Sequence, residues 1–301
     1  MKQGWHIGVV IPARNEEAHI REVLEGLPEM VDVAVVVDDG SSDGTIEAVN
    51  SADRPYDVVV LQRGGQGVGA AVAMGFNHLS NVLDADDLVA VMDGDGQMDP
   101  SDLIPLCHHL VAEQADVVKG DRLAHPDVKG VMPLLRRVAN RGLAVLTTLA
   151  SGRRLGDAQC GFIVVRHEVL TRPNDDPVWS GYGYVNHRFI RWSRHGFRVA
   201  THPVRPVYGE EISGIRPLRF FFSVGAMFVR EHHGRAFSSL AAGPGRVLLS
   251  VALLLYLAGW GSLFVVIAGL VPVSYIAFLP GGWALAHVLD RSVHAGGRAR
   301  I

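Results

Sequence analysis

The amino-acid sequence predicts an α/β fold in which a mostly parallel β-sheet is flanked by helices. Short apolar runs alternate with helical patterns through the first part of the chain, which is typical of βαβ units. Several apolar runs end in Asp and Gly, which are common turn residues after strands. At 301 residues the chain is long enough for one large domain and an appendage.

The same patterns place the individual elements. Strands are predicted at residues 7–11, 33–38, 58–61, 88–92 and 116–119, and helices at 16–27, 43–51, 67–79, 101–113 and 133–150. A second region, 157–205, is expected to add a strand at 162–165, a helix near 183–195 and a strand near 198–202.

The composition excludes one class of partner. With a formal net charge of −3, the chain lacks the basic excess of a nucleic-acid-binding protein. Cys107 and Cys160 lie in apolar surroundings without metal-ligand spacing. Two free thiols are therefore the expected state, and a disulfide framework is not indicated.

The C-terminal part of the chain is expected to enter a membrane. No Asp, Glu, Lys or Arg occurs from residue 247 to 289, a stretch too long for one span of about 20 residues. We expect a helical hairpin with spans near 247–268 and 271–289, with arginines on both flanks placing both ends on the cytoplasmic side. Pro280-Gly281-Gly282 interrupts the second half and leaves one or two spans open. A buried soluble hairpin is the alternative.

The segment before this hairpin has two interpretations. Residues 216–233 mix Phe and Met with Arg, which suits an amphipathic helix in the membrane interface, and a helix packed on the core competes with it. The N-terminus lacks the features of a signal peptide, so we expect a cytoplasmic soluble part tethered to the cell membrane by its C-terminal end. The expected domains are a soluble domain at 1–215, an interfacial helix and linker at 216–245, a membrane hairpin at 246–290 and a cytoplasmic tail at 291–301.

The most informative segment follows the predicted strand at 88–92. Residues at i, i+2 and i+4 of an extended segment point the same way, so Asp93, Asp95 and Gln97 can present oxygen atoms to one point. Oxygen ligands suit Mg²⁺ or Mn²⁺, and open α/β sheets bind ligands at the carboxyl ends of their strands. An ordinary turn is the alternative, because Asp and Gly are frequent turn residues.

Two further loops are expected to line the same crevice. One follows the first strand at 12–17, and the other follows the second strand at 38–45, where Asp39 is placed to hydrogen-bond a ribose or a base. We assign Ser42 or Asp43 a structural role as a helix cap. The Gly-rich loop at 64–69 opens a helix and is a weak candidate for a phosphate cradle.

Taken in order, these motifs resemble the inverting family 2 glycosyltransferases of the GT-A fold. The runs are Ile-Pro-Ala-Arg-Asn-Glu, Val-Asp-Asp-Gly-Ser-Ser-Asp-Gly-Thr, Gly-Val-Gly-Ala-Ala and Met-Asp-Gly-Asp-Gly-Gln. Within the family the chain most resembles the dolichyl- or polyprenyl-phosphate mannose or glucose synthases, over roughly residues 7–215. The segment 155–162 extends the likeness, because it resembles a D-x-x-C/S-G-F motif.

The resemblance implies a role for each matched residue. The nucleotide would contact Pro12, Ala13, Arg14, Glu16, Asp39, Asp93 and Gly94. The metal, Mg²⁺ or Mn²⁺, would be held by Asp93, Asp95 and Gln97. The acceptor phosphate would meet Arg122, Arg136, Arg137 and Asn140, the last in place of a family Ser. The residues expected to act in catalysis are Asp95, Arg122 and Asp157.

One motif departs from the family. Related synthases often carry Arg-x-x-Gly-x-Ser-Lys before the membrane segment, but here Tyr208 takes the Arg position and Gly214 takes the Lys position. Both basic residues would face donor phosphates, so donor binding in this loop must differ. Arg216 is a candidate replacement.

The expected activity is metal-dependent, inverting transfer of one sugar from a UDP- or GDP-linked donor to a polyprenyl phosphate at the cytoplasmic membrane face. A lipid phosphate is already anionic, so no general base is needed and arginines that orient it suffice. Transfer to a glycolipid hydroxyl would need a base, for which Asp157 is the candidate. A sugar-phosphate nucleotidylyltransferase is a further alternative, disfavoured because Pro12-Ala13-Arg14-Asn15 replaces its Gly-rich loop. The intact Asp93, Asp95 and Gln97 disfavour an inactive scaffold.

Overall fold

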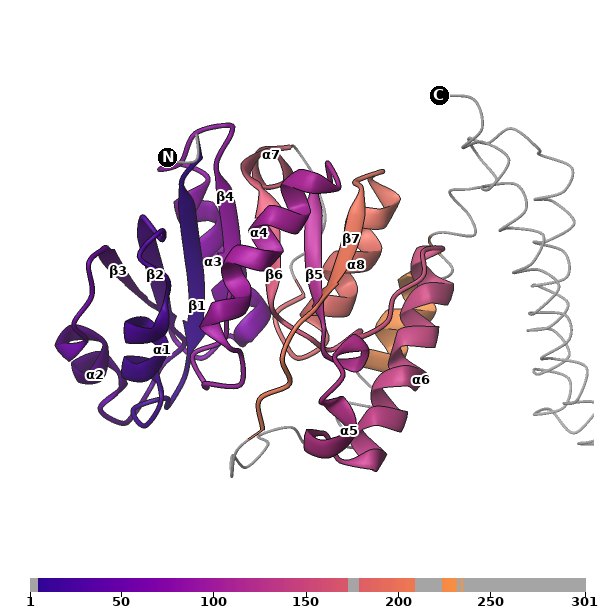
Figure 1. Ribbon diagram of the computed structural model, residues 1–301, viewed down its shortest axis with the longest axis horizontal. Coiled ribbons are helices and arrows are strands. Elements are labelled where there is room, and N and C mark those ends of the chain that lie inside the picture. Colours follow the sequence, from indigo (N-terminus) through magenta and orange to yellow (C-terminus); the bar gives the residue numbers. More distant parts are fainter. Residues whose placement is uncertain (1–4, 173–178, 209–223, 232–233, 235–301) are drawn as a thin grey trace, which may run out of the picture. The chain divides into compact units, whose positions relative to one another are not determined.

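The computed structural model describes residues 5–172, 179–208, 224–231 and 234. Figure 1 shows a central sheet with helices on both faces. In this part of the chain the seven strands lie in the order β3-β2-β1-β4-β6-β5-β7. Their bounds are β1 (Ile7–Ala13), β2 (Val33–Asp38), β3 (Asp57–Gln62), β4 (Leu88–Val91), β5 (Val117–Asp121), β6 (Ile163–Arg166) and β7 (Val199–Pro203).

The helices follow the predicted positions closely. The predicted ones are α1 (Ile20–Gly26), α2 (Thr45–Ser51), α3 (Val68–Leu79), α4 (Leu103–Ala112), α6 (Leu134–Ser151) and α8 (Tyr184–Arg194). The sequence analysis missed the short helices α5 (Val128–Val131) and α7 (His167–Thr171) and the 3₁₀ turns η1 (Pro100–Asp102) and η2 (Arg122–Ala124). These elements are too short to show helical periodicity.

The sheet is mixed, and one strand runs against the others. β1 pairs in parallel with β2 and β4, β2 with β3, and β5 with β7, whereas β6 is antiparallel to both β4 and β5. Because β6 is antiparallel to β5, the residues from 122 to 162 that connect these strands leave and re-enter the sheet at the same end. Lys119 of β5 and Val91 of β4 both pair with Ile163, the first residue of β6. This excursion, which contains η2, α5 and α6, adds side chains beside the carboxyl ends of the parallel strands.

The core has two layers because helices cover both faces of the sheet. Ile7, Val9 and Ile11 of β1 pack with α1 and α4 on one face, whereas Val10 packs with α3 and α8 on the other. Strands buried on both faces read as continuous apolar runs, which explains why β1, β2 and β4 stand out in the sequence.

The amino ends of the strands are fixed by two carboxylates. The Asp32 carboxylate accepts a hydrogen bond of 2.8 Å from the Ile7 amide, and the Asp87 carboxylate accepts bonds of 2.8 Å from the amides of His6 and Asp84. Burial opposes ionisation of Asp87, but these N–H donors outweigh it and lower the pKa of Asp87. A structural carboxylate therefore joins β1 to β4 far from the loops at 12–17 and 93–98.

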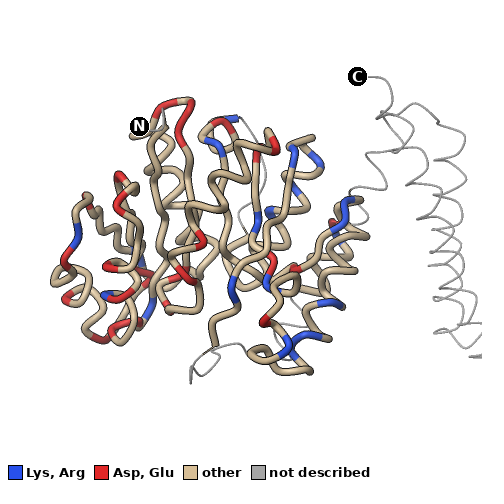
Figure 2. The backbone as a smooth tube through the Cα atoms, viewed as in Figure 1, with Lys and Arg blue, Asp and Glu red and all other residues tan. Residues whose placement is uncertain are grey.

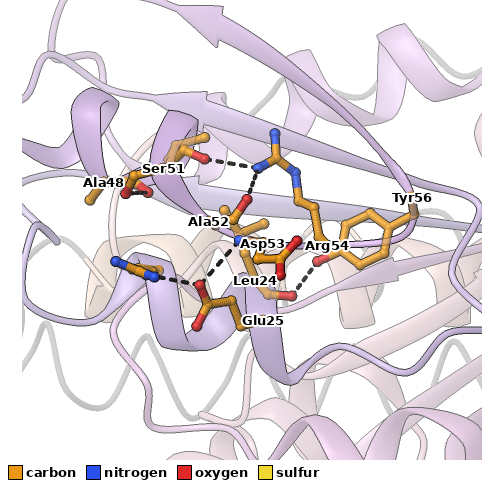
Figure 3. Close-up of polar contacts among 10 residues, drawn as sticks. Leu24, Glu25, Ala48, Ser51, Ala52, Asp53, Arg54 and Tyr56 are labelled. Carbon is orange, nitrogen blue, oxygen red and sulfur yellow. Dashed lines mark hydrogen bonds and ion pairs between the residues drawn. The ribbon is translucent and has the colours of Figure 1, made fainter.

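A polar cluster joins α1 to the turn before β3 (Figure 3). The Glu25 carboxylate accepts hydrogen bonds from Arg21 Nε at 2.8 Å and from the Asp53 amide at 3.1 Å. Arg54 Nη1 donates to the Ala52 carbonyl at 2.7 Å, and the Tyr56 hydroxyl donates to the Leu24 carbonyl. These contacts give the polar groups of the cluster hydrogen-bond partners, and we assign the cluster a structural role.

The expected membrane segments fall mostly outside the described residues. The hairpin at 246–290 and the tail at 291–301 lie wholly outside them, and no described helix is long and apolar enough to cross a bilayer. Of the expected interfacial helix, 224–231 is described, and Val224, Met227 and Phe228 are buried against α6 and α8. The burial of these three side chains agrees with the second interpretation of this segment, a helix packed on the core. The chain divides into two compact units, 1–228 and 229–301, and the site described below lies in the first.

Candidate active site

A cavity of about 770 Å³ opens at the carboxyl ends of β1 and β4. It is lined by many of the residues predicted from the sequence, namely Arg14, Glu16, Asp93, Asp95, Gln97, Arg122, Arg136 and Asn140. Other predicted residues do not line it, namely Pro12, Ala13, Asp39, Gly94, Arg137 and Asp157. The structure thus brings the proposed metal ligands and three of the four proposed phosphate ligands to one cavity.

The loops after β1 and β2 are hydrogen-bonded to each other. The Asn15 amide donates to Ser41 Oγ at 2.9 Å, and the Ser42 amide donates to Asn15 Oδ1 at 2.8 Å. The Glu16 amide donates to Thr45 Oγ1 at 2.9 Å. These bonds hold the two loops together, but only the first lines the cavity, through Arg14, Asn15 and Glu16. The prediction that both loops line one crevice is therefore wrong for the loop at 38–45.

Asp39 holds the Gly-rich loop. It is buried, and its two carboxylate oxygens accept hydrogen bonds from the amides of Gln66 at 2.8 Å and Gly67 at 2.7 Å. Arg63 Nε lies 3.4 Å from the same carboxylate. A nucleoside that bound Asp39 would have to share or displace these partners.

The glycines of that loop allow another segment to approach. A Cβ on Gly67 would lie 2.5 Å from the Ser180 carbonyl oxygen, and one on Gly69 would lie 2.0 Å from that of Trp179. Gly67 also adopts a φ of 99°, and the Gly69 amide donates to the Ser180 carbonyl at 2.8 Å. The start of α3 therefore docks the segment that leads into α8, which gives these glycines a packing role.

Asp93, Asp95 and Gln97 all face the cavity, but from a turn rather than from an extended strand. Gly96 has a φ of 73°, and the Gln97 amide donates to Asp95 Oδ1 at 3.0 Å. Asp93 Oδ1 is shielded from solvent and has no hydrogen-bond partner among the described residues. Burial and the neighbouring Asp95 raise the pKa of Asp93 to about 7.

These residues fit a divalent cation that also binds phosphate oxygens. The described residues contain no cluster of three or more His, Cys, Asp or Glu side chains suited to a metal. Mg²⁺, however, is commonly held by one or two carboxylates with the remaining ligands from substrate phosphates and water. The buried, unpartnered oxygen of Asp93 is the group that such a cation would satisfy.

Arg122, which lines the cavity, forms a buried ion pair with Asp157, which does not line it. Arg122 Nε lies 2.7 Å from Asp157 Oδ2, and Arg122 Nη2 donates to Oδ1 at 3.2 Å. Asp157 is fully buried and also accepts a bond of 2.9 Å from the Gln159 amide. Burial opposes its charge, but Arg122 and Lys119 outweigh this and lower the pKa of Asp157.

Helix α6 adds a basic edge to the cavity. Arg136 lines it, with its guanidinium carbon 4.9 Å from the centre of the Tyr208 ring, and Asn140 lies one turn further along. Arg137 points elsewhere and does not line the cavity. Figure 2 shows that α6 carries Arg but no Asp or Glu. The excursion between β5 and β6 thus brings positive charge to the cavity that the carboxylates of the β4 loop also line.

Sequence reasoning missed several residues that shape the cavity. Gln159 Nε2 donates to Asn186 Oδ1 at 2.7 Å, and Asn186 Nδ2 donates to Thr147 Oγ1 at 2.8 Å, which ties the segment before β6 to α8 and α6. Tyr184 and Gly161 also line the cavity. Gly161 and Gln159 fall within the D-x-x-C/S-G-F segment, to which no role at the cavity was assigned. No motif marks Thr147, Tyr184 or Asn186, because a lone polar side chain on an amphipathic helix is indistinguishable from an ordinary core position.

Residues 8–172 match the sequence profile of the family described as Glycosyl transferase family 2. The chain belongs to glycosyl transferase family 2. This family 2 glycosyltransferase is 25% identical over 219 residues to the UDP-N-acetylglucosamine--dolichyl-phosphate N-acetylglucosaminyltransferase of Methanococcus voltae, covering 68% of this chain and 86% of that protein. It is 29% identical over 182 residues to the dolichol-phosphate mannosyltransferase of Pyrococcus furiosus, covering 57% of this chain and 49% of that protein.

A solved structure shares the fold of this glycosyltransferase. It is glucosyl-3-phosphoglycerate synthase from Mycobacterium tuberculosis in complex with Mn²⁺, UDP-glucose and phosphoglyceric acid. The TM-score is 0.55 at 21% sequence identity, and the match covers 76% of this chain and 80% of that chain. The likeness confirms a GT-A-like α/β fold for the first unit.

Proposed function

We propose that this glycosyltransferase moves a single sugar from a nucleotide-sugar donor to a polyprenyl phosphate, with inversion at the anomeric carbon. One observation carries the proposal: a single cavity is lined both by carboxylates of the β4 loop and by Arg122 and Arg136. The carboxylates suit a cation that binds a diphosphate, and the arginines suit a second phosphate.

The donor would bind at the carboxyl ends of β1, β2 and β4. Arg14 and Glu16 face the cavity there, and Asp93, Asp95 and Gln97 would hold Mg²⁺ or Mn²⁺. When bound, the cation would neutralise charge that develops on the departing diphosphate. The Methanococcus voltae relative is named for a UDP-linked donor, and the Mycobacterium structure contains Mn²⁺ and UDP-glucose. UDP-linked sugars are therefore the first donors to test, and GDP-linked sugars the second.

The acceptor phosphate would bind between Arg122 and Arg136. Both side chains reach the cavity, and Asn140 adds an amide on the same helix face. Arginine matches phosphate oxygens with paired N–H groups, so the two side chains both bind the acceptor and aim one oxygen at the sugar.

The reaction is a single displacement. A phosphate oxygen of the acceptor forms a bond to the anomeric carbon while the bond from that carbon to the donor diphosphate breaks, so the configuration inverts. The attacking oxygen is already anionic at neutral pH and has no proton to lose. A protein base is unnecessary, and positioning supplies the main rate enhancement.

Asp157 acts on Arg122 rather than on a proton of the acceptor. Its carboxylate is fully buried, does not line the cavity, and is engaged by Arg122 and by the Gln159 amide. A general base must reach the proton that it removes. This geometry disfavours transfer to a hydroxyl with Asp157 as the base.

A lipid acceptor explains the exposed face of α6. This helix leaves large apolar side chains in contact with solvent, namely Leu134, Leu135, Val138, Val145 and Leu146. Exposed leucine and valine side chains with arginines among and beside them suit a helix at a membrane surface. We propose that α6 meets the cytoplasmic face of the membrane, to which the apolar stretch at 247–289 would tether the chain.

An acceptor-dependence assay tests the proposal. The full chain in lipid nanodiscs is given Mn²⁺, a UDP- or GDP-sugar and undecaprenyl phosphate, and release of the nucleoside diphosphate is measured. We expect release that requires both the lipid phosphate and the cation, and that is lost when undecaprenol replaces its phosphate. Equal turnover with undecaprenol, or pyrophosphate release from a nucleoside triphosphate and a sugar phosphate, would overturn the proposal.

A further inference from the structure

The two arginines of the proposed acceptor site are held in different ways. Arg122 Nε lies 2.7 Å from Asp157 Oδ2, so this guanidinium shares its N–H groups with a carboxylate. Arg136 is exposed on α6, and among the described residues no carboxylate or carbonyl pairs with its side chain. Its guanidinium carbon lies over the ring of Tyr208, 4.9 Å from the ring centre. An aromatic ring thus takes the place that a carboxylate has beside Arg122.

A ring face suits an arginine that must bind a phosphate. The negative face of an aromatic ring attracts a guanidinium that lies within about 6 Å of its centre. The ring accepts none of the five N–H groups, which stay free to pair with phosphate oxygens. A carboxylate partner would instead occupy some of these donors and compete with the phosphate. Tyr208 can therefore restrain Arg136 without using the groups that bind the acceptor.

The segment that leads to Tyr208 is anchored at its start. Val204 is buried, and the Arg205 amide donates to Asp102 Oδ2 at 2.7 Å. Arg205 Nη1 also donates to Asp99 Oδ2 at 3.1 Å. Tyr208 follows three residues later, so its ring meets α6 from a segment that is tied to the end of β7 and to η1.

The Tyr208 hydroxyl does not explain the contact with Arg136. The hydroxyl oxygen is shielded from solvent and has no hydrogen-bond partner among the described residues. Burial raises the pKa of Tyr208, although Arg122 and Arg136 oppose the shift, so the side chain is neutral at pH 7. The ring is therefore the part that holds Arg136, and a phenylalanine at this position would keep the contact.

We propose that Tyr208 is a positioning residue for Arg136, whose guanidinium it holds at the cavity with the N–H donors free for the acceptor phosphate. The inference rests on the proposed function and adds a residue to the acceptor site. It also gives a role to a position at which the sequence departs from related synthases, because Tyr208 stands where they often carry an Arg that would face donor phosphates.

Binding of a short acceptor analogue tests the inference without a donor. The affinity of the full chain in nanodiscs for geranyl phosphate is measured by calorimetry for the wild type, Tyr208→Phe and Tyr208→Leu. Loss of the cation–π contact predicts about a 2- to 5-fold weaker affinity for Tyr208→Leu, whereas Tyr208→Phe should bind like the wild type. Phe197→Leu is the control and should leave the affinity unchanged, because it removes a similar contact with Arg172, at 4.8 Å, outside the cavity lining.

A double-mutant cycle distinguishes positioning from general packing. Tyr208→Leu should weaken binding no further in an Arg136→Ala background, because the arginine that the ring holds is already absent. The melting temperature of each variant reports its folding. Equal losses in Tyr208→Phe and Tyr208→Leu, no loss in Tyr208→Leu, or a loss that persists in the Arg136→Ala background would overturn the inference. A wild type that binds geraniol as tightly as geranyl phosphate would instead overturn the proposed acceptor site on which the inference rests.

Discussion

Asp157 and Arg122 form a two-point ion pair that joins the segment before β6 to the end of β5. The Nε–Oδ2 distance is 2.7 Å and the Nη2–Oδ1 distance is 3.2 Å, and the carboxylate is fully buried. The pair fixes the plane of the Arg122 guanidinium at the cavity. Its role is therefore to position the arginine, and this role makes a prediction that differs from that of a base.

A double-mutant cycle distinguishes a positioning role of Asp157 from a role as a general base. We expect Asp157→Asn to raise the KM for the lipid phosphate and to lower the free energy of unfolding by about 3 kcal/mol, because it leaves a buried charge unpaired. The double variant with Arg122→Gln should be no less active than the poorer single variant and more stable than Asp157→Asn alone. Activity losses that multiply in the double variant would indicate that Asp157 acts independently of Arg122.

Asp95 is expected to be essential for transfer but not for folding. Asp95→Ala should reduce turnover at least 100-fold at saturating Mn²⁺, because a carboxylate ligand and its charge are lost. The melting temperature should stay within a few degrees of the wild type. Asp116→Ala is the matched control: Asp116 accepts from the Arg198 amide at 2.6 Å and does not line the cavity, so its loss should lower stability by about 1 kcal/mol and spare turnover. Retained turnover in Asp95→Ala would refute the proposed metal site.

The neighbouring residues Arg136 and Arg137 should behave differently. Arg136 lines the cavity and Arg137 does not, although both belong to α6. Arg136→Ala should raise the KM for the lipid phosphate about 10- to 100-fold, as expected for a charge-assisted hydrogen bond. Arg137→Ala should change it by less than about 3-fold. Steady-state kinetics with varied acceptor checks the pair, and a reversed order would contradict the placement of the acceptor.

The exposed face of α6 should matter only for an acceptor in a membrane. Leu135 is 82% exposed, so Leu135→Glu should leave the free energy of unfolding nearly unchanged. We expect it to raise the KM for polyprenyl phosphate in nanodiscs but not that for a short, water-soluble prenyl phosphate. Val82→Glu, at a 58% exposed position beyond the end of α3, is the control and should affect neither KM. Equal effects on the two acceptors would argue against a membrane-facing α6.

Asp87 should make the fold sensitive to acid. Its pKa in the folded state lies below the unfolded value, so its contribution is complete above about pH 4 and is lost as the pH falls through the folded pKa. We expect Asp87→Asn to lower the free energy of unfolding at pH 7 by about 2 kcal/mol, with a difference from wild type that shrinks toward pH 3. Urea denaturation at pH 7, 5 and 3 measures this, and a constant difference would contradict the assignment.

The sequence was sufficient to predict the strands, because burial on both faces makes β1, β2 and β4 continuous apolar runs. It could not predict the direction of β6. The direction of β6 depends on the residues from 122 to 162 returning to the same end of the sheet. The apolar run at 162–165 contains no local pattern that predicts this return.

The candidate site was predictable to a similar degree. The motif residues of the β1 and β4 loops were recognisable because each follows a strand directly, and the structure places Arg14, Glu16, Asp93 and Asp95 at the cavity. The pairing of Asp157 with Arg122 joins residues that are 35 apart in the sequence, and only the fold reveals it.

The linkage of the lipid product tests the central claim most directly. Wild-type chain in nanodiscs is given a radiolabelled nucleotide-sugar, Mn²⁺ and undecaprenyl phosphate, and the labelled lipid is treated with mild acid. A sugar on a lipid phosphate is released by this treatment, and we predict complete release of the label. An acid-stable labelled lipid would be a glycoside, and it would contradict the assignment of Arg122 and Arg136 to an acceptor phosphate.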